Sequence, residues 1–381
     1  MNMKFNMVLI AMILIVILIG GSIATANTSF TDVSNNHWAK SSIERMVEEG
    51  YINGYPNGTF GPNDEITRAE FVSILTRMLN LDDKPNPFSD SEHWADQAIG
   101  SAVDAGIIFE SEYGTSFNPN EAITREEMTK MSARALANEN ETFEEDLSQL
   151  GDTYLPLRDF TSMDDDIVPY VALVHGTGLI GGFEDHSFRL EDKSNRAQAA
   201  TILNRFSRLK DTSSDDHGAL REFVEISTTG TNIESVTGIP TKNIKEDILE
   251  FRFTDGMEVT IKHIIAFDET EEYSTFLPMF ENFDSLTKGE GESYRFSVEM
   301  EVLPTRDMYG FQMNNRFFFG RGGYFPSKED GENFGYNIMR NEMLEEGKST
   351  VAFMEGGLKK DRNMITFQAY NGSPSYIGIE E

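Results

Sequence analysis

The chain has 381 residues, no cysteine and a formal net charge of −32 at pH 7, from 32 Lys and Arg against 64 Asp and Glu. The lack of cysteine excludes a disulfide framework. The acidity disfavours nucleic acid and anionic lipid as partners, because both are repelled at long range. Acidity by itself selects no partner, since it is more often a solubility feature.

Residues 1–26 have the pattern of a secretory signal peptide. Lys4 precedes an apolar run over residues 8–19, and small residues follow, ending in Ala24-Thr25-Ala26. The run is short for a membrane span of ~20 residues, although an uncleaved anchor is the alternative. We expect a secreted chain that begins near Asn27 and does not contact the membrane after cleavage. The remaining length is enough for two domains of ordinary size.

An internal repeat follows, seen first in YPNGTFGPNDEITRAEFVSILTRML at residues 55–79. The same order recurs in YGTSFNPNEAITREEMTKMSARAL and, more loosely, in FEDHSFRLEDKSNRAQAATILNRF. In each copy a Phe precedes an Arg by eight residues, and a second Arg follows nine residues later. These residues are Phe60, Arg68 and Arg77; Phe117, Arg125 and Arg134; and Phe188, Arg196 and Arg205. Three copies in register predict a repeat architecture over residues 28–81, 86–137 and 157–210.

The first two copies are predicted to begin with an amphipathic helix. Trp38 precedes an apolar stripe that includes Ile43, and Gly50 is suited to the left-handed position that ends a helix. Trp94 stands twelve residues before Gly106, which is also the spacing between Trp38 and Gly50. The same helix is therefore predicted in both copies.

The third copy, residues 157–210, is degenerate. It contains no Trp, and Asp159 competes with the run Asp164-Asp165-Asp166 for the place that Asp32 takes in the first copy. An acidic insertion at residues 138–156 separates it from the second copy, and we expect an exposed loop there. Residues 211–218, DTSSDDHG, are predicted to be a polar linker.

Residues 219–381 are predicted to form a β-rich domain, either a sandwich or a small barrel. The segment ILEFRFTDGMEVTIKHIIAF predicts two strands joined at Asp255-Gly256, which is a strong hairpin signal. Further strands are predicted in SYRFSVEMEVL, NRFFFGRGGYF, STVAFM and MITFQAY. A short helix is predicted near residues 338–346.

Each loop–helix junction has a predicted cap followed by an Arg. The capping pairs are Thr67 with Glu70, Thr124 with Glu127, and Asn195 with Gln198. Capping does not explain the Arg, because a cation at the positive helix end is unfavourable by a few tenths of a kcal/mol. Either the Arg is paired with a carboxylate of the protein, such as Asp32 or Asp90, or it binds an anionic ligand together with free helix amides.

The aromatic and basic residues around these helices have two interpretations each. Trp38 and Trp94, the only tryptophans, are either buried against the neighbouring repeat or form an aromatic face for stacking on a sugar. The second Arg of each copy lies late in its helix, where a cation suits the dipole, so a structural role is favoured.

These residues together resemble the S-layer homology repeat. The first copy matches from its F-x-D opening through W-A and G-Y-x-x-G-T-F to I-T-R-A-E, and the second matches well with T-R-E-E. The third matches only in its second half. The resemblance covers about residues 28–210 and does not extend to residues 219–381.

The resemblance implies an α-helical, pseudo-threefold domain in which the first helices form a three-helix bundle and the loop–helix arms form prongs. It also implies that grooves between repeats hold a secondary cell-wall polysaccharide linked to Gram-positive peptidoglycan, with a pyruvylated N-acetylmannosamine as the favoured ligand. The implied carbohydrate-binding residues are Asp32, Trp38, Gly54, Tyr55, Arg68, Asp90, Trp94, Arg125 and Arg196. Because Glu110-Ser111-Glu112 replaces the Gly54-Tyr55 segment in the second copy, we expect one or two competent grooves.

The resulting hypothesis is a cell-wall protein, without a cofactor or a metal site, that is anchored by its repeats and is able to self-associate in a surface layer. The alternative is a wall hydrolase with residues 219–381 catalytic, where Glu269, Glu271 and Glu272 offer carboxylates. His263, on a predicted strand, is interpreted as structural, and no G-x-S-x-G or HExxH motif is present. A third hypothesis is that Phe317-Phe318-Phe319 binds a protein or a sugar. The alternative is that these three residues belong to a strand that is buried on both faces.

Overall fold

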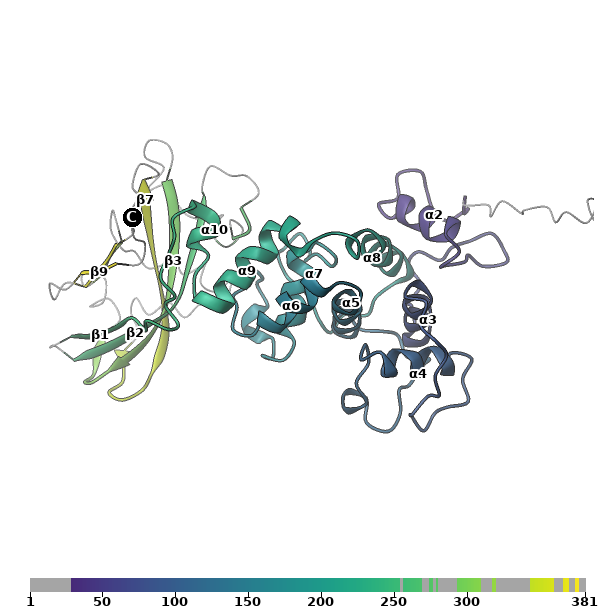
Figure 1. The fold of residues 1–381 in the computed structure, drawn as a ribbon, viewed down its shortest axis with the longest axis horizontal. Helices are drawn as coiled ribbons and strands as arrows, with labels where there is room; N and C mark the ends of the chain where they lie inside the picture. The colour runs from purple at the N-terminus through teal and green to yellow at the C-terminus, as the bar shows by residue number, and fades with distance from the viewer. Residues whose placement is uncertain are drawn as a thin grey trace, which may run out of the picture. The chain divides into compact units, whose positions relative to one another are not determined.

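The computed structural model describes residues 29–253, 256–268, 274–276, 279, 293–309, 317–319, 343–359, 366–369 and 374–376. Helices come first in the described chain, and an antiparallel four-stranded sheet follows (Figure 1). This order confirms the predicted helical region followed by a β-rich region. The chain divides into two compact units, Met1–Ile66 with Asn195–Asn204 and Thr67–Ser194 with Arg205–Glu381. The predicted signal peptide lies outside the described residues.

The first unit contains α2 (Lys40–Glu48) and the first part of α8 (Arg196–Leu209). Ile43 is fully buried on α2, as the predicted apolar stripe requires. Gly50 follows the helix with a φ of +76°, a left-handed conformation that glycine adopts without a Cβ clash. The amide of Asn204 on α8 donates to the hydroxyl of Ser42 on α2 over 2.9 Å. The two helices are thus in direct contact within this unit.

The second unit contains the other helices of the described chain. They are α3 (Arg68–Met78), α4 (Asp96–Asp104), η1 (Glu110–Glu112), α5 (Arg125–Glu139), α6 (Glu141–Gln149), η2 (Phe160–Ser162), α7 (Val168–Gly176), η3 (Ser214–Asp216), α9 (Gly218–Thr229) and α10 (Ile233–Thr237). The helices α3 and α5 have complete capping boxes, and Asn195 and Gln198 exchange equivalent bonds of 2.9 Å at α8. All three predicted caps are confirmed.

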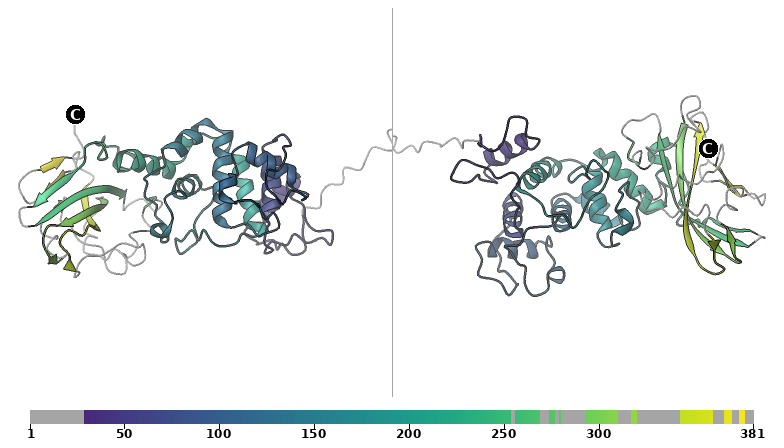
Figure 2. Two further views of the ribbon diagram at one scale, coloured as in Figure 1. Left: turned by 90° about the horizontal axis from the view of Figure 1, so that it is seen from below. Right: turned by 180° about the vertical axis from the view of Figure 1, so that it is seen from behind.

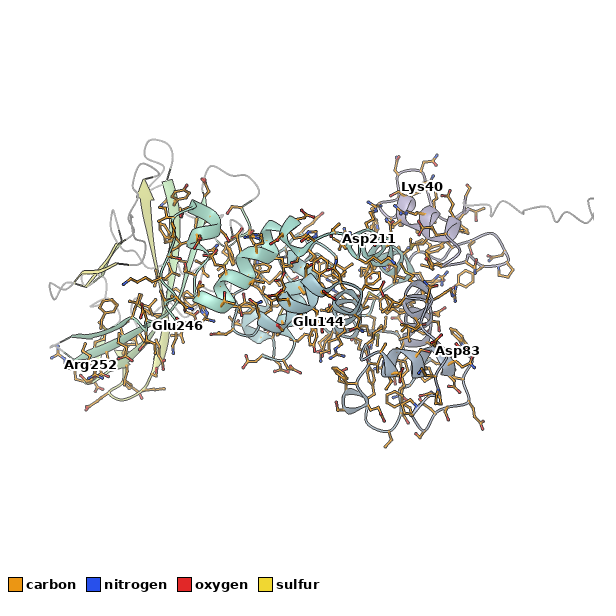
Figure 3. The ribbon with its side chains drawn as sticks, in the orientation of Figure 1. Lys40, Asp83, Glu144, Asp211, Glu246 and Arg252 are labelled. Carbon is orange, nitrogen blue, oxygen red and sulfur yellow. The ribbon has the colours of Figure 1, made fainter. Side chains whose placement is uncertain are left out.

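The acidic insertion is a packed helix, so the predicted exposed loop is wrong. Residues Glu141–Gln149 form α6, on which Phe143 is fully buried while Glu144 is exposed (Figure 3). The side chain of Asn140 caps the helix and also donates to the carbonyls of Lys210 and Thr212. The acidic residues lie mostly on the solvent side, and Phe143, together with Leu150 at the end of the helix, is buried where α6 contacts α5 and α7.

The predicted linker and the start of the β-rich region are also helical, which corrects two boundaries. The segment 211–218 includes η3, where Ser214 is buried and its amide bonds to the Thr142 hydroxyl. Next comes α9, which lies beside α6 and α7 (Figures 1 and 2). Its Phe223 is fully buried. The composition of this stretch is polar, but tertiary packing on one apolar face decides its structure.

The main sheet has the strand order β1-β2-β3-β7, with every neighbouring pair antiparallel. The strands are β1 (Glu250–Phe253), β2 (Met257–Asp268), β3 (Ser293–Pro304) and β7 (Thr350–Lys359). The predicted hairpin is confirmed, because Phe253 pairs with Met257 and Gly256 turns between them with a φ of +109°. The strands predicted in SYRFSVEMEVL and STVAFM are confirmed as β3 and β7.

A β-bulge between Ile261 and His263 changes which side chains of β2 face the core of the sheet. Ile261 belongs to the core cluster before the bulge, and Ile264 belongs to it after the bulge. Ile233 of α10 packs on this same cluster. His263 therefore lies on the opposite face, directly across from Glu299 of β3.

The remaining described strands are short. They are β4 (Met308–Tyr309), β5 (Phe317–Phe319), β6 (Met343–Leu344), β8 (Thr366–Ala369) and β9 (Pro374–Tyr376). β5 and β8 confirm the strands predicted in NRFFFGRGGYF and MITFQAY, and they form a three-stranded sheet with β9. The predicted helix near residues 338–346 is wrong at β6, because pairing with β4 overrides the local propensity. Residues 338–342 lie outside the described residues, as do Glu269, Glu271 and Glu272.

Candidate functional site

An aspartate clamps the loop of each of the first two copies. The Asp32 carboxylate accepts hydrogen bonds from the amides of Phe60 and Gly61 at 2.8 and 2.7 Å. Asp90 accepts from Phe117 and Asn118 at 3.1 and 2.8 Å. Burial raises the pKa of Asp32, but the two amides and the nearby Arg196 outweigh it and leave that pKa below its ordinary value. Both carboxylates therefore hold the turn that carries the repeated Phe.

Asp159 has the same role in the third copy. It is therefore Asp159, and not the run at residues 164–166, that corresponds to Asp32. Its carboxylate accepts from the amide of Phe188 at 2.8 Å and from that of Arg189 at 2.7 Å. Counted from the aspartate to the Phe, the three intervals are 28, 27 and 29 residues. This interval is the sequence signal that identifies Asp159.

Arg68 connects the first copy to the loop of the second. Its Nη1 donates to the carbonyl oxygen of Phe117 at 3.1 Å. It also forms ion pairs with Glu127, from Nε at 2.6 Å, and with Glu121, from Nη1 at 2.8 Å. The Arg68 side chain is only 13% exposed, whereas that of Glu121 is 58% exposed. Glu121 is thus the partner that a solute reaches most easily.

Arg125 and Arg196 make the equivalent link in the other copies, with carbonyl oxygens as partners. Arg125 donates to Phe188 at 2.8 Å and to Gly181 at 3.0 Å. Arg196 donates to Phe60 at 3.0 Å and to Asn53 at 2.8 Å. The first copy therefore bonds to the second, the second to the third, and the third to the first.

The helix amides beside these Arg residues are not free, so that part of the anion-site hypothesis is wrong. The first two amides of α3 donate to Glu121 and Pro119 carbonyls, at 2.9 and 3.0 Å. The corresponding amides of α5 donate to carbonyls in the loop of the third copy, and those of α8 to carbonyls in the loop of the first copy, at 2.9 to 3.1 Å. Loop backbone occupies the helix ends because buried amides need acceptors.

Trp38 and Trp94 are exposed, which contradicts the interpretation that they are buried against a neighbouring repeat. Their exposed fractions are 63% and 66%. Each follows a His whose Nδ1 accepts a backbone amide two residues later, at 3.2 Å. In the third copy, α7 has Ile167 at its N-cap where α2 and α4 have Ala39 and Ala95, so Asp166 takes the place of the Trp.

A surface hollow of about 580 Å³ lies beside the clamp of the second copy. Asp90, His93, Asn120 and Glu121 contribute to its lining. Nε2 of His93 lies 3.1 Å from Oδ1 of Asn120. The hollow is rich in hydrogen-bond acceptors, and Glu121 connects it to Arg68.

The predicted loop residues Gly54 and Tyr55 both lie against the packed interior of the first copy. A Cβ on Gly54 would be 2.1 Å from the Phe30 ring, so the close approach that requires glycine is internal. Tyr55 is 41% exposed, and the Arg196 guanidinium lies 5.0 Å from its ring centroid. Tyr55 is thus reached by solvent, as are Pro56 and Asn57 of the same loop.

The loop segment that differs in the second copy, Glu110–Glu112, contacts Arg134. Glu112, within η1, forms a two-bond ion pair with Arg134 at 2.7 and 2.8 Å. In the third copy Arg205 donates to the Leu179 carbonyl at 3.3 Å. The structural role predicted for the second Arg of each copy is confirmed at these two positions.

Neither a metal centre nor a membrane span is found in the described parts of the chain. No group of three His, Asp or Glu side chains there is arranged to hold a metal ion. None of the helices described is both long and apolar enough to cross a bilayer.

Comparison with known proteins gives matches in the repeat region. Residues 29–72 and 87–129 match the S-layer homology domain. The chain is 32% identical over 213 residues to an endoglucanase of Bacillus sp. (strain KSM-635), covering 53% of this chain and 22% of that protein. It is 35% identical over 179 residues to an amylopullulanase of Thermoanaerobacterium thermosulfurigenes, covering 46% and 9%. It is 36% identical over 117 residues to the S-layer protein EA1 of Bacillus anthracis, covering 30% and 14%.

The chain thus spans less than a quarter of the length of each of these relatives. The matched region carries two S-layer homology repeats, and the described structure of the chain has them on its helical side. These findings indicate a cell-surface protein that contains the S-layer homology domain, with the C-terminal region unassigned.

Proposed function

We propose that residues 157–210 are a third S-layer homology repeat and that the protein attaches non-covalently to a Gram-positive cell wall, displaying its C-terminal region. The third copy repeats the aspartate clamp, the cap and the Arg–carbonyl link of the other two. The ligand proposed is a pyruvylated secondary cell-wall polysaccharide linked to peptidoglycan. Binding requires no chemical step, and two or more grooves would add avidity.

The exposure of Trp38 and Trp94 is the observation that carries this proposal. An indole that is about two-thirds exposed costs hydrophobic free energy unless something covers it, and its flat apolar face suits the apolar face of a sugar. The clamped loops supply polar backbone and side-chain groups nearby. Asp32, Asp90, Gly54 and Tyr55 act in this proposal by shaping those loops.

Arg68 is the cation best placed for the ketal carboxylate. Its pairing with Glu121 shows that a carboxylate fits there, and the exposure of Glu121 allows a ligand carboxylate to replace it. Arg125 and Arg196 are 6% and 7% exposed and bond to carbonyls, so in this proposal they hold the grooves together.

The test is a pull-down with purified Gram-positive walls, before and after chemical removal of pyruvate. A Trp38→Ala and Trp94→Ala double variant should retain at most about a tenth of the binding. The matched control is Ile248→Ala, which removes an exposed apolar side chain outside the repeats. Undiminished binding by the double variant, with a native circular dichroism spectrum, would overturn the proposal.

A second function is favoured by the glycoside hydrolases among the relatives, which align with the repeat region. In this alternative the repeats anchor an enzyme, and residues 219–381 hydrolyse a wall polymer. Assaying the full chain on peptidoglycan and soluble glucans would detect it. Self-association in a surface layer is a further proposal, supported by the match to S-layer protein EA1 and tested by electron microscopy of the purified chain.

A further inference from the structure

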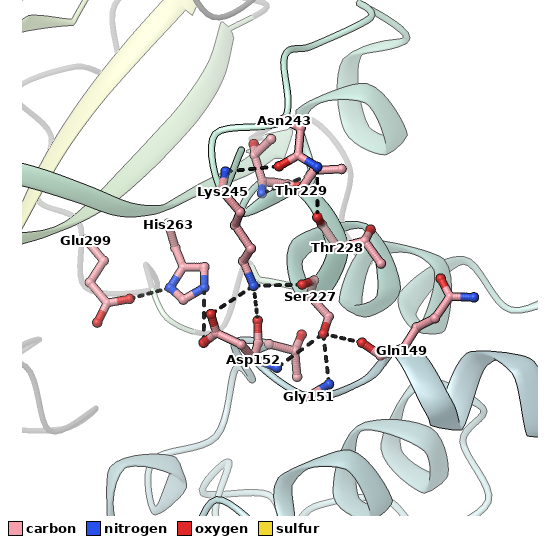
Figure 4. A network of polar contacts seen from close by, with 12 residues as sticks. Gln149, Gly151, Asp152, Ser227, Thr228, Thr229, Asn243, Lys245, His263 and Glu299 are labelled. Atoms are coloured by element: carbon pink, nitrogen blue, oxygen red, sulfur yellow. Dashed lines mark hydrogen bonds and ion pairs between the residues drawn. The ribbon is translucent and has the colours of Figure 1, made fainter. Parts of the chain in front are cut away.

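A second hollow, of about 560 Å³, lies between the sheet and the segment that leads into α7. Its sheet side is one cross-strand row, in which His263 of β2 pairs with Glu299 of β3 and Glu299 pairs with Phe353 of β7. The β-bulge in β2 turns His263 to this face. Its ring lies between Glu299 and Asp152 (Figure 4). The opposite side includes Asp152 and Asp165. All of these residues belong to the second compact unit.

His263 is buried and has one unsatisfied nitrogen. Its side chain is 9% exposed, and its Nδ1 lies 2.7 Å from a carboxylate oxygen of Glu299. Nε2 has no hydrogen-bond partner, and the closest carboxylate oxygen, on Asp152, is 3.6 Å away. In the neutral ring the carboxylate holds the proton on Nδ1, so Nε2 is an acceptor directed at the hollow. A buried acceptor without a donor is costly, which a ligand N–H would relieve.

The other polar groups at the hollow are also acceptors. Asp152, Asp165 and Glu299 contribute three carboxylates, and Lys245 contributes one positive charge through a 2.9 Å ion pair with Asp152. Three carboxylates face one ammonium group here, so negative charge predominates among the groups at the hollow. The ammonium of Lys245 also bonds the carbonyls of Asp152 and Ser227, at 2.7 Å each (Figure 4). This neighbourhood already holds one ammonium group.

Apolar side chains complete the lining. Phe160, Val351 and Phe353 border the hollow, as does Tyr154, whose ring centroid lies 4.9 Å from that of Phe160. Val351 is 40% exposed, so this wall is reached from solvent. Aromatic faces attract cations, and aliphatic chains pack against them.

We propose that this hollow binds a primary ammonium group carried on an aliphatic arm, of the kind present on a lysine side chain. The three N–H donors meet Nε2 of His263 and the carboxylates of Asp152 and Asp165. The arm lies against Phe160 and Val351. A neutral sugar fits less well, because its hydroxyls need donors as well as acceptors and would leave the excess of carboxylates uncompensated.

The test is isothermal titration calorimetry of the full chain with Nα-acetyl-lysine amide. The matched ligand control is the same compound acetylated at Nε, which keeps the arm and loses the charge. We expect about millimolar binding for the first compound and at least tenfold weaker binding for the second. Asp165→Asn should weaken binding two- to fivefold, and Asp164→Asn, an exposed neighbour outside the lining, should leave it unchanged.

His263→Phe gives the largest expected effect, a loss of at least tenfold, because it removes the acceptor and keeps a ring. Should this variant fail to fold, the Asp165 and Asp164 variants decide the result. Nitrogen NMR of the His263 ring should show the ammonium probe shifting Nε2 far more than Nδ1. Equal binding of both lysine compounds, no saturation by about 50 mM, or binding of methyl N-acetylglucosaminide in preference would overturn the proposal.

Discussion

The second and third copies differ at the residues that come just before their first helix. In the second copy His93 and Trp94 precede α4, and the indole is 66% exposed. In the third copy Asp165 and Asp166 hold those positions before α7, and Asp165 borders the hollow shared with the sheet. The copy with an open face has an aromatic residue there, while the copy that contacts the C-terminal region has acids. The same local fold therefore serves two different surfaces.

The largest effect is expected from α6, a helix that occurs only before the third copy and is held by the buried side chain of Phe143. Phe143→Ala should lower the free energy of unfolding by about 3–5 kcal/mol, because it leaves a cavity under α6. Glu144→Ala, on the exposed side of the same helix, should change it by less than about 0.5 kcal/mol. Urea denaturation measures both. Equal effects would mean that α6 is not packed as described.

The third copy should have a pH dependence from a buried histidine that the first two copies lack at the same helix position. Burial lowers the pKa of His175 on α7 to about 4, and the ring stacks on Phe223 of α9. The unfolded chain binds this proton near pH 6.5, so the stabilising contribution is complete above that pH and is lost as the pH falls towards 4. The first two copies have Val47 and Val103 at this helix position.

The measurement is the unfolding free energy between pH 4.5 and 7.5 for the wild type and for His175→Val. The wild type should lose up to about 1.4 kcal/mol more per pH unit than the variant in this window. Parallel pH profiles would show that His175 is accessible to protons in the folded chain.

The aspartate clamps of the second and third copies should contribute equally to the free energy of unfolding, although the surfaces of the two copies differ. Asp159→Asn and Asp90→Asn should each cost about 1–3 kcal/mol, because each weakens two charge-assisted bonds to backbone amides. Asp164→Asn is the control, since this exposed carboxylate lies in the run that competes with Asp159 in the sequence. A larger loss from Asp164→Asn would reverse the assignment of the clamp.

The smallest expected effect is on wall binding, through the pairing of Glu121 with Arg68. Glu121→Gln should strengthen binding to pyruvylated walls by about two- to fivefold, because it removes the carboxylate that competes for Arg68. Glu110→Gln makes the same change at an exposed position of the loop and should have no effect. Weaker binding by Glu121→Gln would indicate that Glu121 itself contacts the ligand.

The sequence predicts features that depend on short intervals. Caps, the stripe with Ile43 and the hairpin at Gly256 each involve residues a few positions apart, where local geometry leaves one arrangement. The partners of Arg125 and Arg196 could not be predicted in this way. They are carbonyl oxygens up to 143 residues away, and a carbonyl has no residue type to recognise.

Two other errors have a common physical cause. The segment of α6 is acidic, and that of α9 carries polar residues between Leu220, Phe223 and Ile226; each becomes helical because a single face meets apolar neighbours from distant parts of the chain. The position of His263 likewise depends on a bulge that no local pattern reveals. Composition describes the solvent face of such segments, and packing determines their structure.

The bonds from Arg196 to Phe60 and Asn53 have a consequence for how the chain matures. They join segments up to 143 residues apart, so the first loop lacks these two donors until the start of α8 has been synthesised. Contacts of such long range form late, because the entropy of closing the intervening chain is lost before they stabilise anything. A nascent or truncated chain that stops after the second repeat lacks Arg196, so the carbonyls of Phe60 and Asn53 do not receive its hydrogen bonds. The first repeat therefore gains its full set of bonds only after the third repeat has been made.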